Sequence, residues 1–183
     1  MHSCLIVIDL QNDYFPGGTM ELVGIEAAAA NARLLLDRYR ETGSAVIHIQ
    51  HLAVRPGATF FLPETAGAAT NELVTPQANE IVVVKNYPNS FRGTSLLEIL
   101  QQEKVDHLVI CGAMSHMCID ATVRAAFDLG FTCLVAEDAC ATRDLEFRGR
   151  TIKAADVHAS FMAALSIPYA RVITTMEVME NRG

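Results

Sequence analysis

The chain contains short, unbroken runs of Val, Ile and Leu that are separated by longer stretches with helical patterning. A strand with one face in water alternates apolar and polar residues, whereas a continuous apolar run indicates a strand that is buried on both faces. Such strands are typical of parallel sheets covered by helices. The predicted strands are residues 4–10, 45–50, 80–85, 107–112, 132–137 and 171–174. The predicted helices are residues 25–42, 94–102, 118–129 and 152–165.

This alternation predicts an α/β protein with a Rossmann-like, three-layer α/β/α architecture. We expect a sheet of six mostly parallel strands in the doubly wound order 3-2-1-4-5-6. Residues 1–183 are expected to form a single domain, because this length suffices for one full core and no linker or repeat interrupts it. The proline- and glycine-rich segment 51–79 predicts a long loop, either a lid over a site or an arm that grips another subunit.

Composition and charge exclude several classes of partner. The formal net charge of −7 favours neither nucleic acid nor an anionic membrane. No segment reaches the roughly 18 unbroken apolar residues of a membrane span, and no signal peptide is visible, so we expect a cytoplasmic protein. The five cysteines form no CxxC pair, and we expect reduced thiols that are mostly small core residues.

Three reactive side chains lie where predicted strands end. Asp9 and Lys85 fall at the ends of the first and third strands, and Cys118 follows the fourth strand where the chain enters a helix. The carboxyl ends of parallel strands form the edge at which doubly wound proteins bind ligands. The helix dipole is expected to favour the thiolate of Cys118, with Asp9 moving protons and Lys85 holding Asp9 in place. These positions predict nucleophilic catalysis by a cysteine.

Four motifs resemble the isochorismatase-like cysteine hydrolase superfamily, which includes nicotinamidases, N-carbamoylsarcosine amidases, ureidoacrylate hydrolases and isochorismatases. They read LIVIDLQNDYF at 5–15, VKNYPNSF at 84–91, GAMSHMC at 112–118 and EDACA at 137–141. The resemblance covers nearly the whole chain and implies that Asp9, Lys85 and Cys118 are the catalytic triad. It also implies a cis peptide bond between Ala113 and Met114, so that the N–H groups of Met114 and Cys118 form an oxyanion hole.

The resemblance also shows where the chain departs from the metal-binding members. Nicotinamidases bind a metal through an Asp-x-His after the second strand, and here Gln50 and Leu52 stand at those positions. We therefore expect no metal and no other cofactor. His48 is interpreted as a core histidine and His51 as a residue of the loop or the pocket rim, although a metal near either one stays open.

The expected activity is cleavage of a C–N bond in a small amide, carbamoyl compound or lactam through an acyl-enzyme. Alternatives are hydrolysis of a vinyl ether, as by isochorismatases, and a non-catalytic redox or binding protein on the same fold. The expected partners are a small-molecule substrate and further copies of the chain in a homodimer or homotetramer. Candidates for the substrate pocket are Gln11, Phe15, Phe60, Phe61, Ser90 and Phe91.

Other polar residues near the motifs have simpler explanations. Asp120 and Arg124 are four residues apart on the predicted helix, which is the spacing of an ordinary ion pair. His116 precedes Cys118 by two residues, and we favour a structural hydrogen bond over a general-base role. His158 is also expected to be structural.

Overall fold

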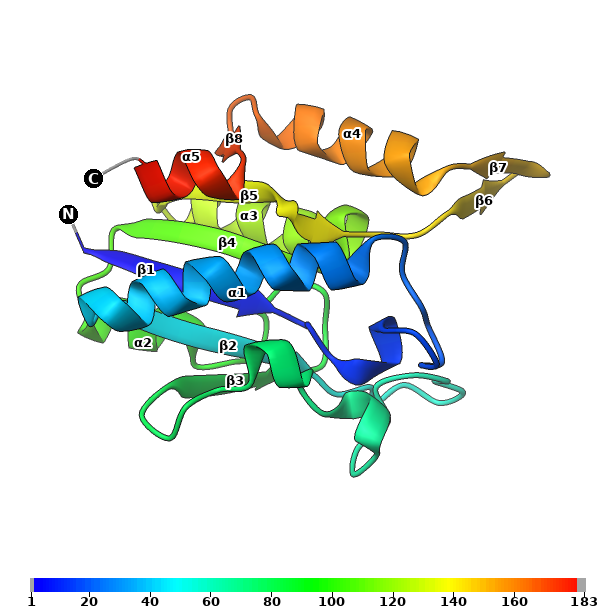
Figure 1. Cartoon of the computed structure of the whole chain (residues 1–183), viewed down its shortest axis with the longest axis horizontal. Helices are drawn as coiled ribbons and strands as arrows, with labels where there is room; N and C mark the ends of the chain where they lie inside the picture. The colour runs from blue at the N-terminus through cyan, green and yellow to red at the C-terminus, as the bar shows by residue number, and fades with distance from the viewer. Residues whose placement is uncertain (1, 181–183) are drawn as a thin grey trace.

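The computed structural model describes residues 2–180, which form a central sheet with helices on both faces (Figure 1). Six parallel strands run in the order β3-β2-β1-β4-β5-β8. Their bounds are Ser3–Ile8 for β1, Ala45–His51 for β2, Ile81–Lys85 for β3, His107–Ala113 for β4, Thr132–Ala141 for β5 and Arg171–Ile173 for β8. The predicted architecture and strand order are confirmed, since β8 is the sixth strand of this sheet along the chain.

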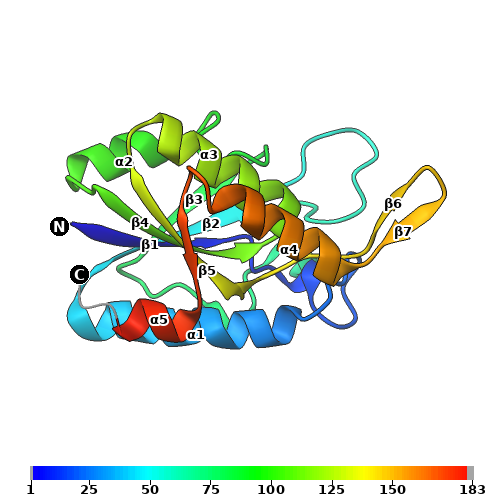
Figure 2. The same cartoon turned by 90° about the horizontal axis from the view of Figure 1, so that it is seen from above.

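The helices lie in two layers, one on each face of the sheet (Figure 2). One layer holds α1 (Ile25–Thr42) and α5 (Thr175–Glu180), and the other holds α2 (Leu96–Gln102), α3 (Asp120–Asp128) and α4 (Ala154–Leu165). A hydrophobic core lies on each face of the sheet, and alternate side chains of β1 point into one or the other. Leu5 and Val7 pack in the core with α1, whereas Ile6 and Ile8 pack in the core with α2 and α3. The unbroken apolar run of β1 therefore has a direct structural reason.

Three features differ from the predicted pattern. Strand β5 continues beyond residue 137 to Ala141, because its last residues pair with Gly112 and Ala113 after a bulge. The strands β6 (Leu145–Phe147) and β7 (Arg150–Ile152) form an antiparallel hairpin that projects from the body of the protein (Figure 1). Neither this hairpin nor α5 was predicted, because elements of three to six residues are too short to display a periodic pattern.

The long loop between β2 and β3 bonds to the segment that follows β1. It contains two short 3₁₀ turns, η2 (Ala66–Ala68) and η3 (Glu72–Val74). Gln11 and Thr70 form an isolated antiparallel bridge, and the N–H of Asn71 donates to the carbonyl of Leu10. These bonds hold the loop beside the carboxyl ends of β1 and β2. Within residues 2–180, no helix has the length and apolar character to cross a bilayer.

Candidate active site

The three predicted catalytic side chains meet at the carboxyl edge of the sheet. Asp9 follows β1, Lys85 ends β3, and Cys118 lies in a π-helical turn, η4 (Ser115–Ile119), that leads from β4 into α3. The Nζ atom of Lys85 lies 2.7 Å from Oδ2 of Asp9 and 3.2 Å from Sγ of Cys118. Asp9, Lys85 and Cys118 are 0%, 1% and 3% exposed, so a carboxylate, an ammonium and a thiol share a nearly dry space.

The backbone around this cluster departs from regular strand geometry. Asp9 has a left-handed φ of 52°, which is uncommon for any residue other than glycine and often marks a functional site. Gly112 has a φ of 125°, and a Cβ atom there would overlap the backbone of Ile8. Strands β1 and β4 can therefore approach this closely only with glycine at position 112. The Ala113–Met114 peptide bond is cis.

Burial controls the protonation of the thiol. The pKa of Cys118 is raised well above its ordinary value, first by burial and then by the charge of Asp9, while Lys85 acts in the opposite direction. We expected the helix end to favour a thiolate, but burial of the sulfur acts in the opposite direction and is the largest influence on its pKa. Burial therefore favours the protonated thiol, and a thiol needs a base before it can act as a nucleophile.

Asp9 is placed to be that base. Its Oδ2 accepts a hydrogen bond from Lys85, whereas Oδ1 is buried and has no hydrogen-bond partner among the described residues. An acceptor atom of Asp9 and the Cys118 sulfur lie within 4.8 Å of each other. Burial alone would lower the pKa of Lys85, but the charge of the Asp9 carboxylate and its hydrogen bond raise it, so the ammonium is favoured. The cluster therefore pairs a protonated thiol with a carboxylate that has a free acceptor.

His51 is the residue of the cluster that the sequence analysis did not assign to catalysis. It ends β2 directly beside Lys85 in the parallel register, and its Nδ1 lies 3.0 Å from the Lys85 Nζ. Acceptor atoms of Asp9, His51 and Cys118 all lie within 4.8 Å of one another, a spacing that suits a cation. The Lys85 ammonium bonds to all three residues. A metal ion does not fit this set of atoms unless it displaces the ammonium.

The predicted pocket residue Gln11 has a different function. Its side-chain amide donates to the carbonyls of His51 and Ala68 at 2.9 and 2.8 Å, and its oxygen accepts from the N–H of His51 at 2.8 Å. Gln11 is only 1% exposed. Both amide hydrogens and the oxygen are occupied, so this side chain fixes the backbone of His51 and has no donor left for a substrate.

The long loop contributes an aromatic wall beside the cluster. Phe61 packs against Tyr14 and His51, with ring centroids 4.5 and 5.8 Å apart, and Phe60 packs on both Phe61 and Tyr14. The N–H of Phe61 donates to the carboxylate of Asp13 at 2.6 Å. Tyr14 was not predicted as a site residue, although it lies in the first motif. Burial is the largest cause of the raised pKa of Tyr14.

The remaining predicted pocket residues make contacts with the core. Phe15 is buried in the core that packs under α1. Ser90 is fully buried and hydrogen bonds Thr122 of α3 through its backbone N–H and its hydroxyl. The ring of Phe91 stacks on Phe131. The contacts of Ser90 and Phe91 hold the segment after Lys85 against the helix that follows Cys118.

The predicted structural roles of the neighbouring polar residues fit their contacts. The Nδ1 atom of His116 lies 2.6 Å from the hydroxyl of Thr142, and that of His158 lies 2.8 Å from the hydroxyl of Ser115. In the predicted ion pair, Nε of Arg124 donates to Asp120 at 2.9 Å.

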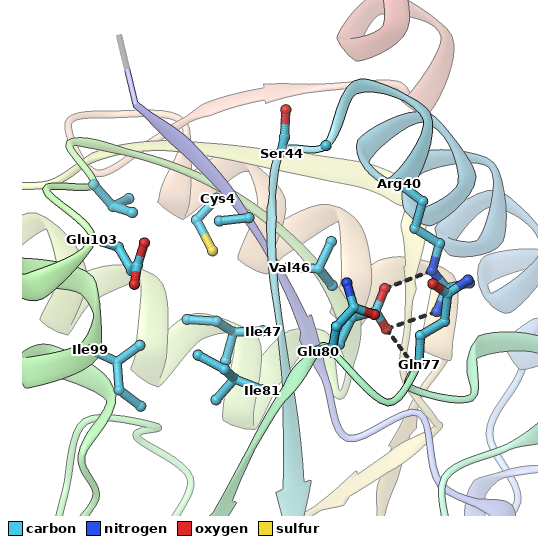
Figure 3. Close-up of a pocket in the computed structure, with 14 residues that line it drawn as sticks. Cys4, Arg40, Ser44, Val46, Ile47, Gln77, Glu80, Ile81, Ile99 and Glu103 are labelled. Atoms are coloured by element: carbon cyan, nitrogen blue, oxygen red, sulfur yellow. Dashed lines mark hydrogen bonds and ion pairs between the residues drawn. The ribbon is translucent and has the colours of Figure 1, made fainter.

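A separate cavity of about 310 Å³ lies near the amino ends of β2 and β3 (Figure 3). Its wall includes Arg40 and Glu80, and none of the three predicted catalytic residues lines it. The Glu80 carboxylate accepts two hydrogen bonds from Arg40, at 2.7 and 2.8 Å, one from the N–H of Gln77 and one from Nε2 of His48. Arg40, Glu80 and His48 therefore bond to one another at this end of the strands.

Comparisons with known proteins show the family of the chain and its fold. A family model described as the isochorismatase domain matches residues 3–175. The chain is 51% identical to YddQ, an uncharacterized isochorismatase family protein of Bacillus subtilis, over 175 residues that cover 96% of this chain and 97% of the relative. It is 29% identical to a maleamate amidohydrolase of Pseudomonas putida, over 97% of this chain and 85% of that enzyme. A crystal structure from Oleispira antarctica matches with a TM-score of 0.95 at 49% identity, covering 98% of this chain and 97% of the other.

Proposed function

This chain belongs to the isochorismatase family of hydrolases, and from that premise we propose that it cleaves a C–N bond of a small amide, carbamoyl compound or lactam through an acyl-enzyme. Asp9, Lys85 and Cys118 are the catalytic triad of this proposal. The observation that carries it is the Asp9 carboxylate, which has one buried, unpartnered oxygen and lies within 4.8 Å of the Cys118 sulfur.

In the first half-reaction, Asp9 Oδ1 takes the proton of the Cys118 thiol as the sulfur attacks the acyl carbon. A C–S bond forms, and the former carbonyl oxygen becomes an oxyanion that accepts hydrogen bonds from the N–H groups of Met114 and Cys118. As this intermediate collapses, the C–N bond breaks and protonated Asp9 delivers its proton to the departing nitrogen. The amine leaves, and a thioester on Cys118 remains.

In the second half-reaction, Asp9 removes a proton from water, and the resulting oxygen nucleophile attacks the thioester. The C–S bond breaks, the carboxylic acid leaves, and the proton held by Asp9 returns to the sulfur. Lys85 stays an ammonium throughout and offsets the negative charge that passes between Asp9 and Cys118. Its position, within hydrogen-bond distance of both groups, supports this role.

The proposed substrate class rests on two observations. Cys118 is only 3% exposed, which supports a small substrate. The relative named maleamate amidohydrolase acts on the C–N bond of a small amide. Hydrolysis of a vinyl ether proceeds by protonation and needs no thiol nucleophile, so the presence of Cys118 in the cluster favours the amide class.

The test is turnover of a panel of maleamate, small primary amides, carbamoyl compounds and lactams by the purified protein. We expect Cys118→Ala to lower kcat/KM by about a thousandfold or more on any amide that the wild type cleaves. Cys133→Ala, which changes another buried cysteine, should remain within about threefold, because Cys133 lies near the amino end of β5, opposite Leu108, whereas the triad lies at the carboxyl edge of the sheet.

Two outcomes would contradict the proposal. If Cys118→Ala kept full activity on a vinyl ether that the wild type hydrolyses, the protein would be an ether hydrolase. If no member of the panel were cleaved and Cys118 formed a reversible sulfenic acid, the fold would carry a redox function.

A further inference from the structure

The Lys85 ammonium has three hydrogens, and three acceptors surround it. They are Oδ2 of Asp9 at 2.7 Å, Nδ1 of His51 at 3.0 Å and Sγ of Cys118 at 3.2 Å. An ammonium can only donate, so Nδ1 of His51 has to accept. The proton of the neutral imidazole is then on Nε2, on the far side of the ring from Lys85. The contact between Lys85 and His51 therefore specifies one tautomer and one charge state.

The fold holds His51 in this place from several directions. Gln11 bonds both the N–H and the carbonyl of His51, and the parallel register sets His51 directly opposite Lys85. The ring packs against Phe61. Two of the three hydrogen bonds of the Gln11 amide go to His51 and the third goes to the carbonyl of Ala68. These contacts hold the backbone and the ring of His51 in one position beside Lys85.

The electrostatic surroundings keep the ring neutral. The pKa of His51 is lowered first by burial and then by the charge of Lys85, with Arg55 of the loop acting in the same direction and Asp9 opposing it. The charged or titratable groups that face the ring are thus Lys85 from β3, Asp9 after β1, Cys118 from η4 and Arg55. Protonation of His51 would remove the acceptor and place a second positive charge beside the ammonium.

We propose that His51 is a positioning residue of the reaction centre, whose neutral imidazole holds the Lys85 ammonium between the Asp9 carboxylate and the Cys118 sulfur. The inference rests on the proposed function of the triad. A lysine side chain has four rotatable bonds, and two acceptors leave its head free to pivot. The third acceptor fixes all three N–H directions. Without it, one hydrogen of a residue that is 1% exposed would be left unpaired.

The first test needs no substrate. Nitrogen-15 NMR of the full chain reports the tautomer of each histidine, and we expect His51 to show the neutral Nε2–H form at pH 7. His107 is the internal reference, because its Nδ1 lies 2.8 Å from the Asp106 carboxylate and must carry a hydrogen. An Nδ1–H tautomer or an imidazolium at His51 of the wild type at pH 7 would overturn the inference.

The second test compares two replacements on the best amide of the panel. Asn offers an oxygen near the position of Nδ1, whereas Phe keeps the size of the ring and offers no acceptor. We expect His51→Phe to lower kcat about tenfold or more with KM changed by less than about threefold, and His51→Asn to keep most of kcat. Any acid limb that His51 causes in the wild-type profile of kcat against pH should be absent in His51→Asn. Equal losses in both variants, or a change in KM alone, would show that only packing was lost.

Failure of the two proposals can be told apart. If the panel shows no amide turnover while His51 has the Nε2–H form, the proposed function fails and the lysine-binding role of His51 stands. If amides are cleaved and Cys118→Ala is inactive, but His51 has the wrong tautomer, the triad stands and the inference about His51 fails.

Discussion

Strands β2 and β3 carry a buried charged cluster near each of their ends, and the two clusters treat their carboxylates differently. Near the amino ends, Glu80 accepts four hydrogen bonds, from Arg40, Gln77 and His48. At the carboxyl ends, Asp9 accepts one hydrogen bond from Lys85, and its second oxygen is buried without a partner. The Glu80 carboxylate is saturated, meaning that both of its oxygens accept hydrogen bonds, whereas the Asp9 carboxylate has one oxygen that accepts none.

This difference separates a stabilising cluster from a reactive one. The pKa of Glu80 is lowered to about 2, first by the hydrogen bonds from Arg40, so it stays ionised at any ordinary pH and contributes to folding. Asp9 lies beside a protonated thiol and has a free oxygen to receive its proton. Leaving a buried acceptor unpaired costs stability, and sites of chemistry are where proteins accept such a cost.

The two histidines of β2 repeat the contrast. His48 donates through Nε2 to the saturated carboxylate of Glu80, on the α1 side of the sheet. His51 accepts through Nδ1 from Lys85, which belongs to the reactive cluster. They are three residues apart, so a strand places them on opposite faces. One histidine therefore donates a hydrogen bond to a carboxylate, and the other accepts one from an ammonium.

The largest effect is expected from Asp9→Asn. The variant keeps the shape of the side chain but removes the base, and kcat/KM should fall by about 10²–10⁴-fold on any amide that the wild type cleaves. Circular dichroism should confirm that the variant is folded. Asp37→Asn, at an exposed pair with Arg33 on α1, is the matched control and should leave kcat/KM unchanged. Activity of Asp9→Asn near that of the wild type would remove Asp9 from the mechanism.

The next effect is on folding, at the saturated carboxylate. The folded pKa of Glu80, about 2, is below its ordinary value of 4.5, so its ionisation stabilises the fold above about pH 5, and this contribution is lost as the pH falls toward 2. We expect Glu80→Gln to lower the free energy of unfolding by about 1–2 kcal/mol at pH 7, because solvent screens part of the interaction with Arg40.

Urea unfolding of both proteins from pH 7 down to the lowest pH at which they fold checks this expectation. The difference in the free energy of unfolding between the wild type and Glu80→Gln should become smaller as the pH falls. Glu72→Gln, at an exposed position of η3, is the control. A difference in the free energy of unfolding that is the same at every pH would mean that Glu80 acts through packing and not through its charge.

The smallest effect is expected beside the nucleophile, at Arg124. Its guanidinium pairs with Asp120 and lies over the ring of Tyr169, and its side chain is 34% exposed. Exposed pairs of this kind contribute little, so Arg124→Ala should change the free energy of unfolding by about 0.5 kcal/mol and kcat/KM by less than about twofold. A loss of tenfold or more in kcat/KM would give Arg124 a role in the reaction that its contacts do not suggest.

Much of this molecule could be predicted from sequence because the informative signals are local. Continuous apolar runs gave the six strands of the sheet, and their ends placed Asp9, Lys85 and Cys118 at one edge. What could not be predicted depends on register and burial. The hydrogen bond from Lys85 to His51 requires the alignment of β2 with β3, which no residue pattern announces.

The protonation of the thiol was missed for the same kind of reason. A helix following Cys118 suggests a thiolate, but the desolvation that raises its pKa comes from residues scattered along the whole chain. The function of Gln11 was also hidden, because its bonding partners His51 and Ala68 are 40 and 57 residues away. Both the protonation of Cys118 and the hydrogen bonds of Gln11 depend on contacts between residues far apart in the sequence, which short motifs do not contain.

The central claim is that the Cys118 sulfur becomes acylated while Asp9 removes its proton. Rapid quenching of the wild-type protein with its best amide, followed by mass spectrometry of the intact chain and its peptides, tests this most directly. The account predicts a transient mass increase equal to the acyl part of the substrate, located on Cys118, that forms much more slowly in Asp9→Asn. Steady turnover with no adduct, in a protein whose Cys118→Ala variant remains active, would contradict it.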